Sequence, residues 1–426
     1  MAFLKIKAGA LQFTLFIAVV VALLLFAFIL FVQTHKKFNI QTNYVIETAN
    51  LAQMGIEYAL LNAIKANDTT TVDLNQKDYE TLKIHKSYWG VFEKLMSVAS
   101  IKNNSFKKVS LVGGQQLDFS NRTCLFLKET NRPLIVVGST HIEGVAQLSE
   151  SGIKPGTIAG HSYYGNQLIY GSVRLSRVYP SLPDELLNQL KSINTINFTD
   201  TELIAYKHGI KVKNSFLSPR KVIFDSSDIR LTNVTLTGNI IIQSNTKIIV
   251  ENNALLNDVL LIAPSIVIKD RVKGKFQAIA SKTIIVDNEV ELKYPSALVL
   301  IKKRYENYTN NKINNPTENN QIHIGSNTTI HGVVLFNDMS VATNHNSQVL
   351  IDKNSVIHGE VYCNRNIELK GRVYGTVYTA NFLTRNAGSV YQNHLFNTEI
   401  NVNKLSEFYV GLPLVLNPKS VVKWLY

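Results

Sequence analysis

An uncharged run of 25 residues near the amino terminus constrains the chain most. Residues 8–32 read AGALQFTLFIAVVVALLLFAFILFV. A helix of about 20 apolar residues is long enough to cross the hydrocarbon core of a bilayer. The run is longer than the apolar core of a signal peptide, and no A-x-A cleavage site follows it. We therefore expect residues 1–33 to form a short cytoplasmic tail and one transmembrane helix, with the lipid bilayer as its partner.

The helical pattern continues beyond this run. Over residues 45–63 apolar side chains recur at spacings of 4, 3, 4, 3 and 4, as on one face of an amphipathic helix. They are Val45, Ala49, Ala52, Ile56, Ala59 and Ala63. Thr48 lies off this stripe and is expected to tolerate a charge. Because no proline interrupts residues 10–66, we predict one continuous helix, whose second half, residues 34–66, packs on a folded domain.

These amino-terminal residues resemble the type IV pilin superfamily, particularly the minor pseudopilins of pilus and type II secretion machines. The resemblance is carried by a short basic leader, Met1–Gly9, by Ala10–Leu15 (ALQFTL) and by Asn50–Leu61 (NLAQMGIEYALL). It implies cleavage between Gly9 and Ala10 and packing in an assembly through a helix that includes Phe13 and Thr14. Most pilins carry a glutamate at the fifth mature position, where this chain has Thr14. An ordinary signal anchor followed by a stalk is the alternative.

Beyond the helix, short apolar runs alternate with glycine and asparagine, which is typical of strands joined by tight turns. The runs Val259–Ala263 and Phe276–Ala280 begin 17 residues apart, and Ile266–Ile268 and Ile284–Val286 begin 18 residues apart. A repeat of this length suits the coil of a parallel β-solenoid. A β-sandwich, which also has short strands and asparagine-rich turns, is the alternative.

A second repeat has the form apolar-x-Gly-x-Val and places glycines at regular positions. It occurs at Ile330–Val334, Ile357–Val361 and Leu369–Val373, with looser relatives elsewhere. Its apolar residues are expected to point inward and Glu360 outward, while the glycines turn the corners. The predicted corner residues are Gly144, Gly238, Gly332, Gly359 and Gly371. The stretch 322–382 resembles the bactofilins, which are cytoskeletal β-solenoid proteins.

The predicted fold is therefore mainly β, with a long N-terminal helix followed by a parallel, right-handed β-solenoid. Beyond the two helical parts, we expect a mixed α/β packing segment at 67–132, with a short helix at 87–100. A first β region with a short cap helix is expected at 133–218, the solenoid at 219–395 and a C-terminal cap at 396–426. The polar stretch 305–321 is expected to be a surface loop.

No group of residues predicts an active site. Asp225, Asp228 and Arg230 are the candidates for a solenoid enzyme that acts on polysaccharides, but a solvated turn explains them equally well. His331 and His358 occupy equivalent repeat positions and are expected to stack, yet a zinc site needs at least one further ligand. We therefore predict no catalytic residue, no metal and no cofactor, and we expect that the chain is not an enzyme.

Charge and cysteine content exclude further classes. The formal net charge is +13, but the basic residues are scattered, and no basic stripe with interleaved aromatic residues indicates a nucleic-acid partner. Only two cysteines, Cys124 and Cys363, occur, so the chain is no disulfide scaffold.

Together these features predict a single-pass protein of the inner (cytoplasmic) membrane, with the bulk of the chain periplasmic or extracellular. Its expected role is structural: a scaffold or minor pseudopilin-like component of a bacterial envelope or pilus-type assembly, with protein partners in that complex. The alternative is a membrane-tethered β-solenoid that binds or cleaves carbohydrate, with a glycan as its partner.

Overall fold

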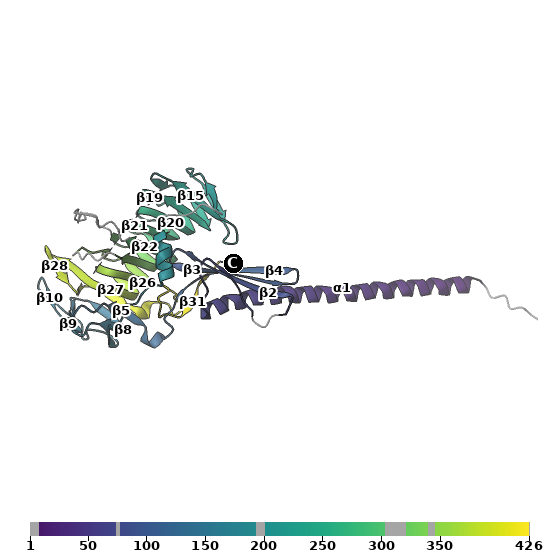
Figure 1. Ribbon diagram of the computed structural model, residues 1–426, viewed down its shortest axis with the longest axis horizontal. Coiled ribbons are helices and arrows are strands. Elements are labelled where there is room, and N and C mark those ends of the chain that lie inside the picture. Colours follow the sequence, from purple (N-terminus) through teal and green to yellow (C-terminus); the bar gives the residue numbers. More distant parts are fainter. Residues whose placement is uncertain (1–7, 74–76, 193–200, 303–320, 340–345, 426) are drawn as a thin grey trace, which may run out of the picture. The chain divides into compact units, whose positions relative to one another are not determined.

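The computed structural model describes residues 8–73, 77–192, 201–302, 321–339 and 346–425 (Figure 1). The chain divides into two compact units. The first comprises residues 1–58, 70–84 and 97–108, and the second comprises 59–69, 85–96 and 109–426. Most of the polar stretch 305–321 and the adjoining basic residues Lys303 and Arg304 lie outside the described residues.

The long helix α1 spans Ala8–Leu61, 54 residues, and ends before the predicted Ala66. Its buried face is shorter than predicted and includes different residues. Ile56 is fully buried, whereas Val45 and Ala63 are exposed. Thr48 is only 1% exposed, and its hydroxyl donates a hydrogen bond to the Tyr44 carbonyl oxygen at 2.5 Å. The expectation that Thr48 lies off the packing face is therefore wrong, because a small polar side chain can be buried on that face when its hydroxyl bonds to its own helix.

Within the first unit, a glycine lets α1 approach the sheet closely. A side chain at Gly55 would collide with the Ser97 hydroxyl, and its Cβ would lie 2.9 Å from a methyl group of Leu82. Leu82 lies in β2 (Glu80–Trp89) and Ser97 in β3 (Phe92–Ile101). Gly55 is thus the contact point between helix and strands, flanked by the buried side chains of Ala52 and Ile56.

The helix predicted at 87–100 is wrong. This segment is the end of β2, a turn at Gly90, where φ is +63°, and most of β3. From Leu95 to Ile101 buried and half-buried residues alternate strictly, which is the period of a strand. Phe92, Leu95 and Ala99, whose helical spacing led to the prediction, are buried positions of this strand.

The first sheet has the strand order β1-β2-β3-β4-β31. It contains β1 (Thr69–Thr71), β4 (Asn104–Gly114) and β31 (Lys419–Trp424) in addition to the hairpin strands. β31 pairs antiparallel with β4, with Lys419 opposite Gly114. Residues 115–418 are therefore inserted between two neighbouring strands of one sheet.

The inserted region is a parallel β-solenoid, which confirms the predicted fold class of a mainly β protein with one long apolar N-terminal helix. Each coil has three faces, and the longest strands pass round all three with register shifts at the bends. The closed sheet contains β5 (Thr123–Leu127), β7 (His141–Glu143), β8 (Val145–Leu148), β12 (Val173–Leu175), β13 (Thr201–Ile204), β14 (Lys211–Asn214), β15 (Arg220–Asp225), β16 (Ile229–Leu231), β17 (Thr235–Gly238), β18 (Ile240–Ser244), β19 (Lys247–Val250), β20 (Leu255–Ile268), β21 (Lys273–Val286), β22 (Glu291–Lys302), β23 (Gln321–Ile324), β24 (Thr329–Asp338), β25 (Val349–Ile351), β26 (Val356–Leu369), β27 (Arg372–Asn386), β28 (Ser389–Gln392) and β30 (Glu399–Asn401).

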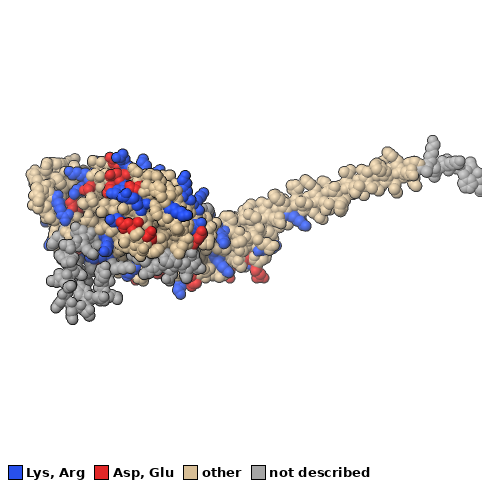
Figure 2. Space-filling view, turned by 90° about the horizontal axis from the view of Figure 1, so that it is seen from above, with Lys and Arg blue, Asp and Glu red and all other residues tan. Residues whose placement is uncertain are grey.

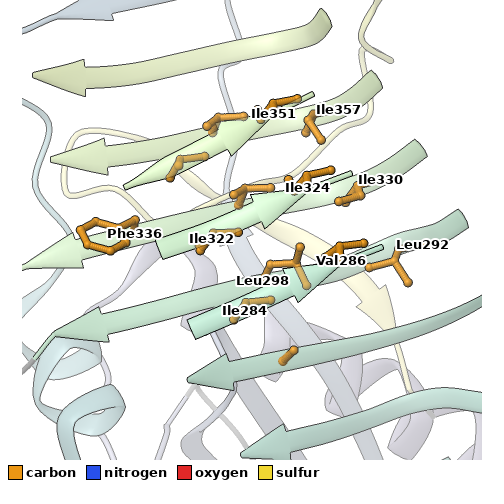
Figure 3. Close-up of a cluster of buried hydrophobic side chains, with 14 of the residues drawn as sticks. Ile284, Val286, Leu292, Leu298, Ile322, Ile324, Ile330, Phe336, Ile351 and Ile357 are labelled. Carbon is orange, nitrogen blue, oxygen red and sulfur yellow. The ribbon is translucent and has the colours of Figure 1, made fainter. Parts of the chain in front are cut away.

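The three faces are defined here by their ladders of register partners. Face 1 contains the ladder Ile330–Ile357–Val373–Ile400–Ile142. Face 2 contains Val334–Val361–Val377–Leu125–Ala146. Face 3 contains Ile248–Ile266–Ile284–Ile322–Val349–Ile367–Phe382. Figure 3 shows such apolar side chains stacked one above another inside the coils.

The stack is assembled from two stretches of chain out of sequence order. The described residues between 201 and 401 build successive coils, and β5 then pairs with β27, with Leu125 opposite Val377. The coils of residues 123–175 continue the stack from there through β8 and β12. Three further strands, β29 (His394–Phe396), β6 (Leu134–Val137) and β9 (Ile153–Pro155), form a parallel sheet, and β10 (Thr157–Ile158) pairs with β11 (His161–Ser162). The solenoid sheet therefore contains strands on both sides of the predicted range 219–395.

Face 2 is buried on both sides, because a second layer covers it. Its outward residues join a second hydrophobic cluster with the turn between β2 and β3, α2 (Asp184–Ser192) and the C-terminal segment around Leu412. Strands buried on both faces read as continuous apolar runs, such as residues 297–301 and 333–336.

Candidate functional site

The first half of α1 presents an apolar surface, and none of the described residues packs against its most apolar part. Its most apolar 18-residue window has none of its residues buried, and it is long and apolar enough to cross a membrane. Figure 2 shows this stretch almost free of charged side chains. Gly9, Ala10 and Phe13 are exposed in the helix, and the Thr14 hydroxyl donates back to the Ala10 carbonyl oxygen at 3.1 Å.

The second half of α1 is held by polar contacts as well as by apolar packing. The Lys102 ammonium donates to the Tyr44 hydroxyl at 2.6 Å and lies 4.4 Å from the centroid of the same ring. Lys108 donates to the Gln53 side chain. Ala52, Ile56 and Ala59 of the predicted stripe are buried, and Ala49 is half-buried. One helix thus combines an exposed apolar half with a half fixed to a folded domain.

Four of the predicted corner glycines lie where face 1 passes into face 2, and the fifth does not. Gly144, Gly238, Gly332 and Gly359 all have positive φ. The register partner of Gly359 in the next coil is Gly375, not Gly371, so the repeat is Val373–Val377 and not Leu369–Val373. A Cβ on Gly359 would meet the carbonyl oxygen of Gly332 in the neighbouring coil. These glycines thus allow coils to stack closely at one bend.

The turns between face 3 and face 1 use asparagine and other non-glycine residues instead. Residues with φ near +60° occur at equivalent turns of several coils, and each is followed by a buried valine, threonine or serine. They are Asn233, Arg271, Glu289, Asn327 and Asn354. This placement agrees with the expectation that asparagine supplies left-handed turn residues.

The two predicted stacking histidines do stack, on the outside of face 1. The ring centroids of His331 and His358 lie 4.3 Å apart, with 9° between the ring planes. Burial lowers the pKa of both imidazoles. Ring nitrogens in two parallel planes direct their lone pairs along parallel lines, so the pair cannot chelate one ion. Among the residues that the structure describes, no group of three or more His, Cys, Asp or Glu could hold a metal ion.

The three candidate catalytic residues each have a separate local partner. The Asp225 carboxylate accepts hydrogen bonds from the Ser227 amide at 2.9 Å and hydroxyl at 2.8 Å, which lower its pKa. Asp228 accepts a hydrogen bond from Thr246 at 2.7 Å. Arg230 pairs with Glu251 in the neighbouring coil at 3.3 Å. These contacts are those of a turn and a strand edge.

A buried carboxyl group on face 2 was missed by the sequence analysis. Glu360, predicted to face solvent, is 3% exposed, and its Oε2 accepts a hydrogen bond from the Leu412 amide at 2.6 Å. Burial raises the pKa of Glu360 to about 8. The prediction failed because it assumed that the outer side of every face is solvated. The apolar run that follows, Val361–Cys363, was the signal that this strand is covered on both sides.

A second buried polar residue fixes the hairpin of β2 and β3 onto face 2. The Gln277 side chain accepts a hydrogen bond from the Val91 amide at 2.9 Å and donates one to the Trp89 carbonyl oxygen at 2.9 Å. Both cysteines, Cys124 and Cys363, are buried free thiols, and burial raises the pKa of each to about 12.

No protein-family model and no curated protein sequence matches the chain. Among solved structures, the chain is similar to the competence-associated pilin ComZ from Thermus thermophilus, with 9% sequence identity. That alignment covers 90% of this chain and 97% of the other, with a TM-score of 0.23. A TM-score of this size does not establish a common fold and carries no argument about function.

Proposed function

We propose that the chain is a membrane-anchored structural component of a bacterial envelope or pilus-type assembly. The observation that carries the proposal is the division of α1. Its first half is an exposed apolar surface, whereas its second half packs at Gly55 and Ile56 against strands of a sheet. The resemblance of the amino terminus to minor pseudopilins implies the same use of one helix, as anchor and as packing element.

The position of the solenoid supports a display role. Because β31 returns to pair with β4, the solenoid is inserted in the sheet rather than attached by one linker. Two covalent connections hold it to the same sheet. In the proposal, α1 lies in the cytoplasmic membrane, residues 34–426 lie outside the cytoplasm, and no catalytic role falls to the chain.

The first test is processing at the amino terminus. The full chain with a C-terminal tag is expressed with a prepilin peptidase, and its mass is determined. We expect loss of Met1–Gly9 and a new terminus at Ala10. Gly9→Leu should block the cleavage, whereas Ala8→Ser at the neighbouring position should not. A wild-type chain that keeps its first nine residues in the presence of the active peptidase would refute pilin-type processing.

The second test is topology. Asn252 is an exposed turn residue of the solenoid, and both native thiols are buried, so a cysteine at this position has a clean background. We expect Asn252→Cys to react with a membrane-impermeant thiol reagent once the outer barrier is permeabilised. Reaction only after lysis of the cytoplasmic membrane would place the solenoid inside the cell and overturn the proposal.

A further inference from the structure

A cavity of about 510 Å³ lies on the solenoid beside the hairpin of β27 and β28. This hairpin is an excursion from the regular coil: Asn386 and Ser389 pair across a two-residue turn, and both turn residues, Ala387 and Gly388, have positive φ. Residues 383–387 of this hairpin line the cavity together with residues 353–354, 368–372 and 396–397. The volume falls within the range of small-ligand sites, about 300–1,000 Å³.

The lining carries an excess of positive charge. Four cations, Lys353, Lys370, Arg372 and Arg385, face one carboxylate, that of Glu368. Among the described residues, acids outside the lining pair with two of these cations: Asp352 with Lys370 at 3.5 Å and Glu399 with Arg372 at 4.0 Å. The exposed Lys353 has no ion-pair partner among the described residues.

Glu368 pairs with two of the four cations in the lining. Its side chain is 3% exposed, and it contacts the Arg385 guanidinium at 2.5 Å and the Lys370 ammonium at 3.2 Å. Arg385 also donates to the Ser347 hydroxyl at 2.8 Å. The charges of Arg385 and Lys370 are therefore engaged by Glu368 within the lining, which leaves Lys353 and Arg372 as the cations that a ligand can approach.

The rest of the lining suits a sugar ring. Asn354 and Asn386 provide amide groups that can donate and accept hydrogen bonds. The Thr384 hydroxyl already donates to the His394 carbonyl oxygen at 2.7 Å and can only accept from a ligand. The Asn397 amide oxygen accepts from the Ser139 amide at 2.9 Å, which leaves its NH₂ group as a donor. The half-buried ring of Phe396 provides apolar surface. Hydroxyl-rich ligands with apolar ring faces need this combination, and the cations add a preference for a carboxylate.

We propose that this cavity binds a uronic acid unit of an acidic polysaccharide. Lys353 and Arg372 pair with the sugar carboxylate, the amides bind the ring hydroxyls, and Phe396 contacts the ring face. The proposal concerns a ligand of the solenoid and does not depend on the pilin-type role of α1.

The test is a titration of the purified full chain in detergent with an α-1,4-linked galacturonate trimer. The matched ligand is the same trimer with its carboxylates reduced to alcohols. We expect binding of the acidic trimer that weakens as salt rises, and at least tenfold weaker binding of the reduced trimer. Equal affinity for both trimers, or no binding of either, would overturn the proposal, as would inorganic phosphate binding as tightly as the acidic trimer.

Variants locate the binding in the cavity. Lys353→Gln and Arg372→Gln should each weaken binding of the acidic trimer about tenfold, since each removes one charge-assisted contact. Lys269 is the matched control, because it follows face 3 in another coil and pairs with Asp287 as Lys370 pairs with Asp352, but lines no part of the cavity. Lys269→Gln should bind normally. If all three variants weaken binding alike, the cavity is not the site.

Discussion

Faces 1 and 2 of the solenoid differ in what covers them, and strand β26 shows the difference within three residues. His358 lies on the outer side of face 1, half-buried and stacked on His331. Glu360 lies on the outer side of face 2, under a second layer that includes Leu412. The coil interior is equally apolar behind both. Whether an outward side chain contributes to stability is therefore decided by the protein layer that covers its face, and not by the geometry of the strand.

The largest effect is expected at the bend between the two faces. Gly359 has φ +148°, and a Cβ there would meet the Gly332 carbonyl oxygen. Gly359→Val should lower the free energy of unfolding by about 4 kcal/mol, from backbone strain and overpacking together. Gly388→Ala is the control: its φ is +80°, but no atom lies within 4 Å of the added Cβ, so a loss of about 1 kcal/mol is expected.

Hydrogen exchange tests whether this damage stays local. Solenoid coils contact mainly their neighbours, so loosening in Gly359→Val should be strongest in residues 330–380 and weaker in 220–250. A uniform loss of protection across the chain would contradict the expectation that each coil is stabilised mainly by its two neighbours.

The next effect compares outward residues of one strand, β24. Leu335 is fully buried under the layer on face 2, whereas Thr329 is half-buried on face 1. Leu335→Ala should cost roughly 3–4 kcal/mol, because the layer above cannot fully close the cavity. Thr329→Ala should change stability by about 0.5 kcal/mol or less. Chemical denaturation of the full chain measures both, and similar losses would show that face 2 is not covered as described.

A third effect appears as a dependence on pH. Burial raises the pKa of Glu360 to about 8 from an ordinary value of 4.5, so between these values the unfolded chain loses a proton that the folded chain keeps. Stability is therefore lost as pH rises through this window. For a shift of this size the loss between pH 5 and 8 is about 3 kcal/mol. Glu360→Gln should remove this loss, and an unchanged slope in that variant would place the titrating group elsewhere.

The sequence predicted the structural elements correctly where the same local pattern of apolar and polar residues repeats along the chain. The apolar run of α1 and the spacing of 17 and 18 residues depend on local geometry alone, and both predicted the elements observed. The stack of His331 on His358 followed from the second repeat, apolar-x-Gly-x-Val, in which both histidines occupy the same position. Such features can be predicted without knowing which distant residues pack against them.

Several of the failures arose because burial depends on residues outside the local pattern. Glu360 is buried by Leu412, a residue 52 positions later. The strand at 92–101 was read as a helix because Phe92, Leu95 and Ala99 have helical spacing, whereas their burial is decided by the sheet. The cavity beside β27 and β28 combines four short segments, and no motif in any of them marks it.

The smallest effect is expected on face 1, and its pH dependence has the opposite sign to that of Glu360. Burial lowers the pKa of His358 below its ordinary value of 6.5, and the neighbouring His331 lowers it further. Below pH 6.5 the unfolded chain therefore binds a proton that the folded chain resists, so stability is lost as pH falls. In a Glu360→Gln background, which removes the opposing slope, His358→Ala should cost about 1 kcal/mol at pH 8 through the lost ring contact and should flatten the decline between pH 6.5 and 5. His208→Ala, at an exposed histidine outside this stack, should leave the decline unchanged. The opposite result, in which His208→Ala flattens the decline and His358→Ala does not, would contradict this prediction. It would show that the histidine stack on face 1 contributes no more to the pH dependence of stability than an exposed side chain does.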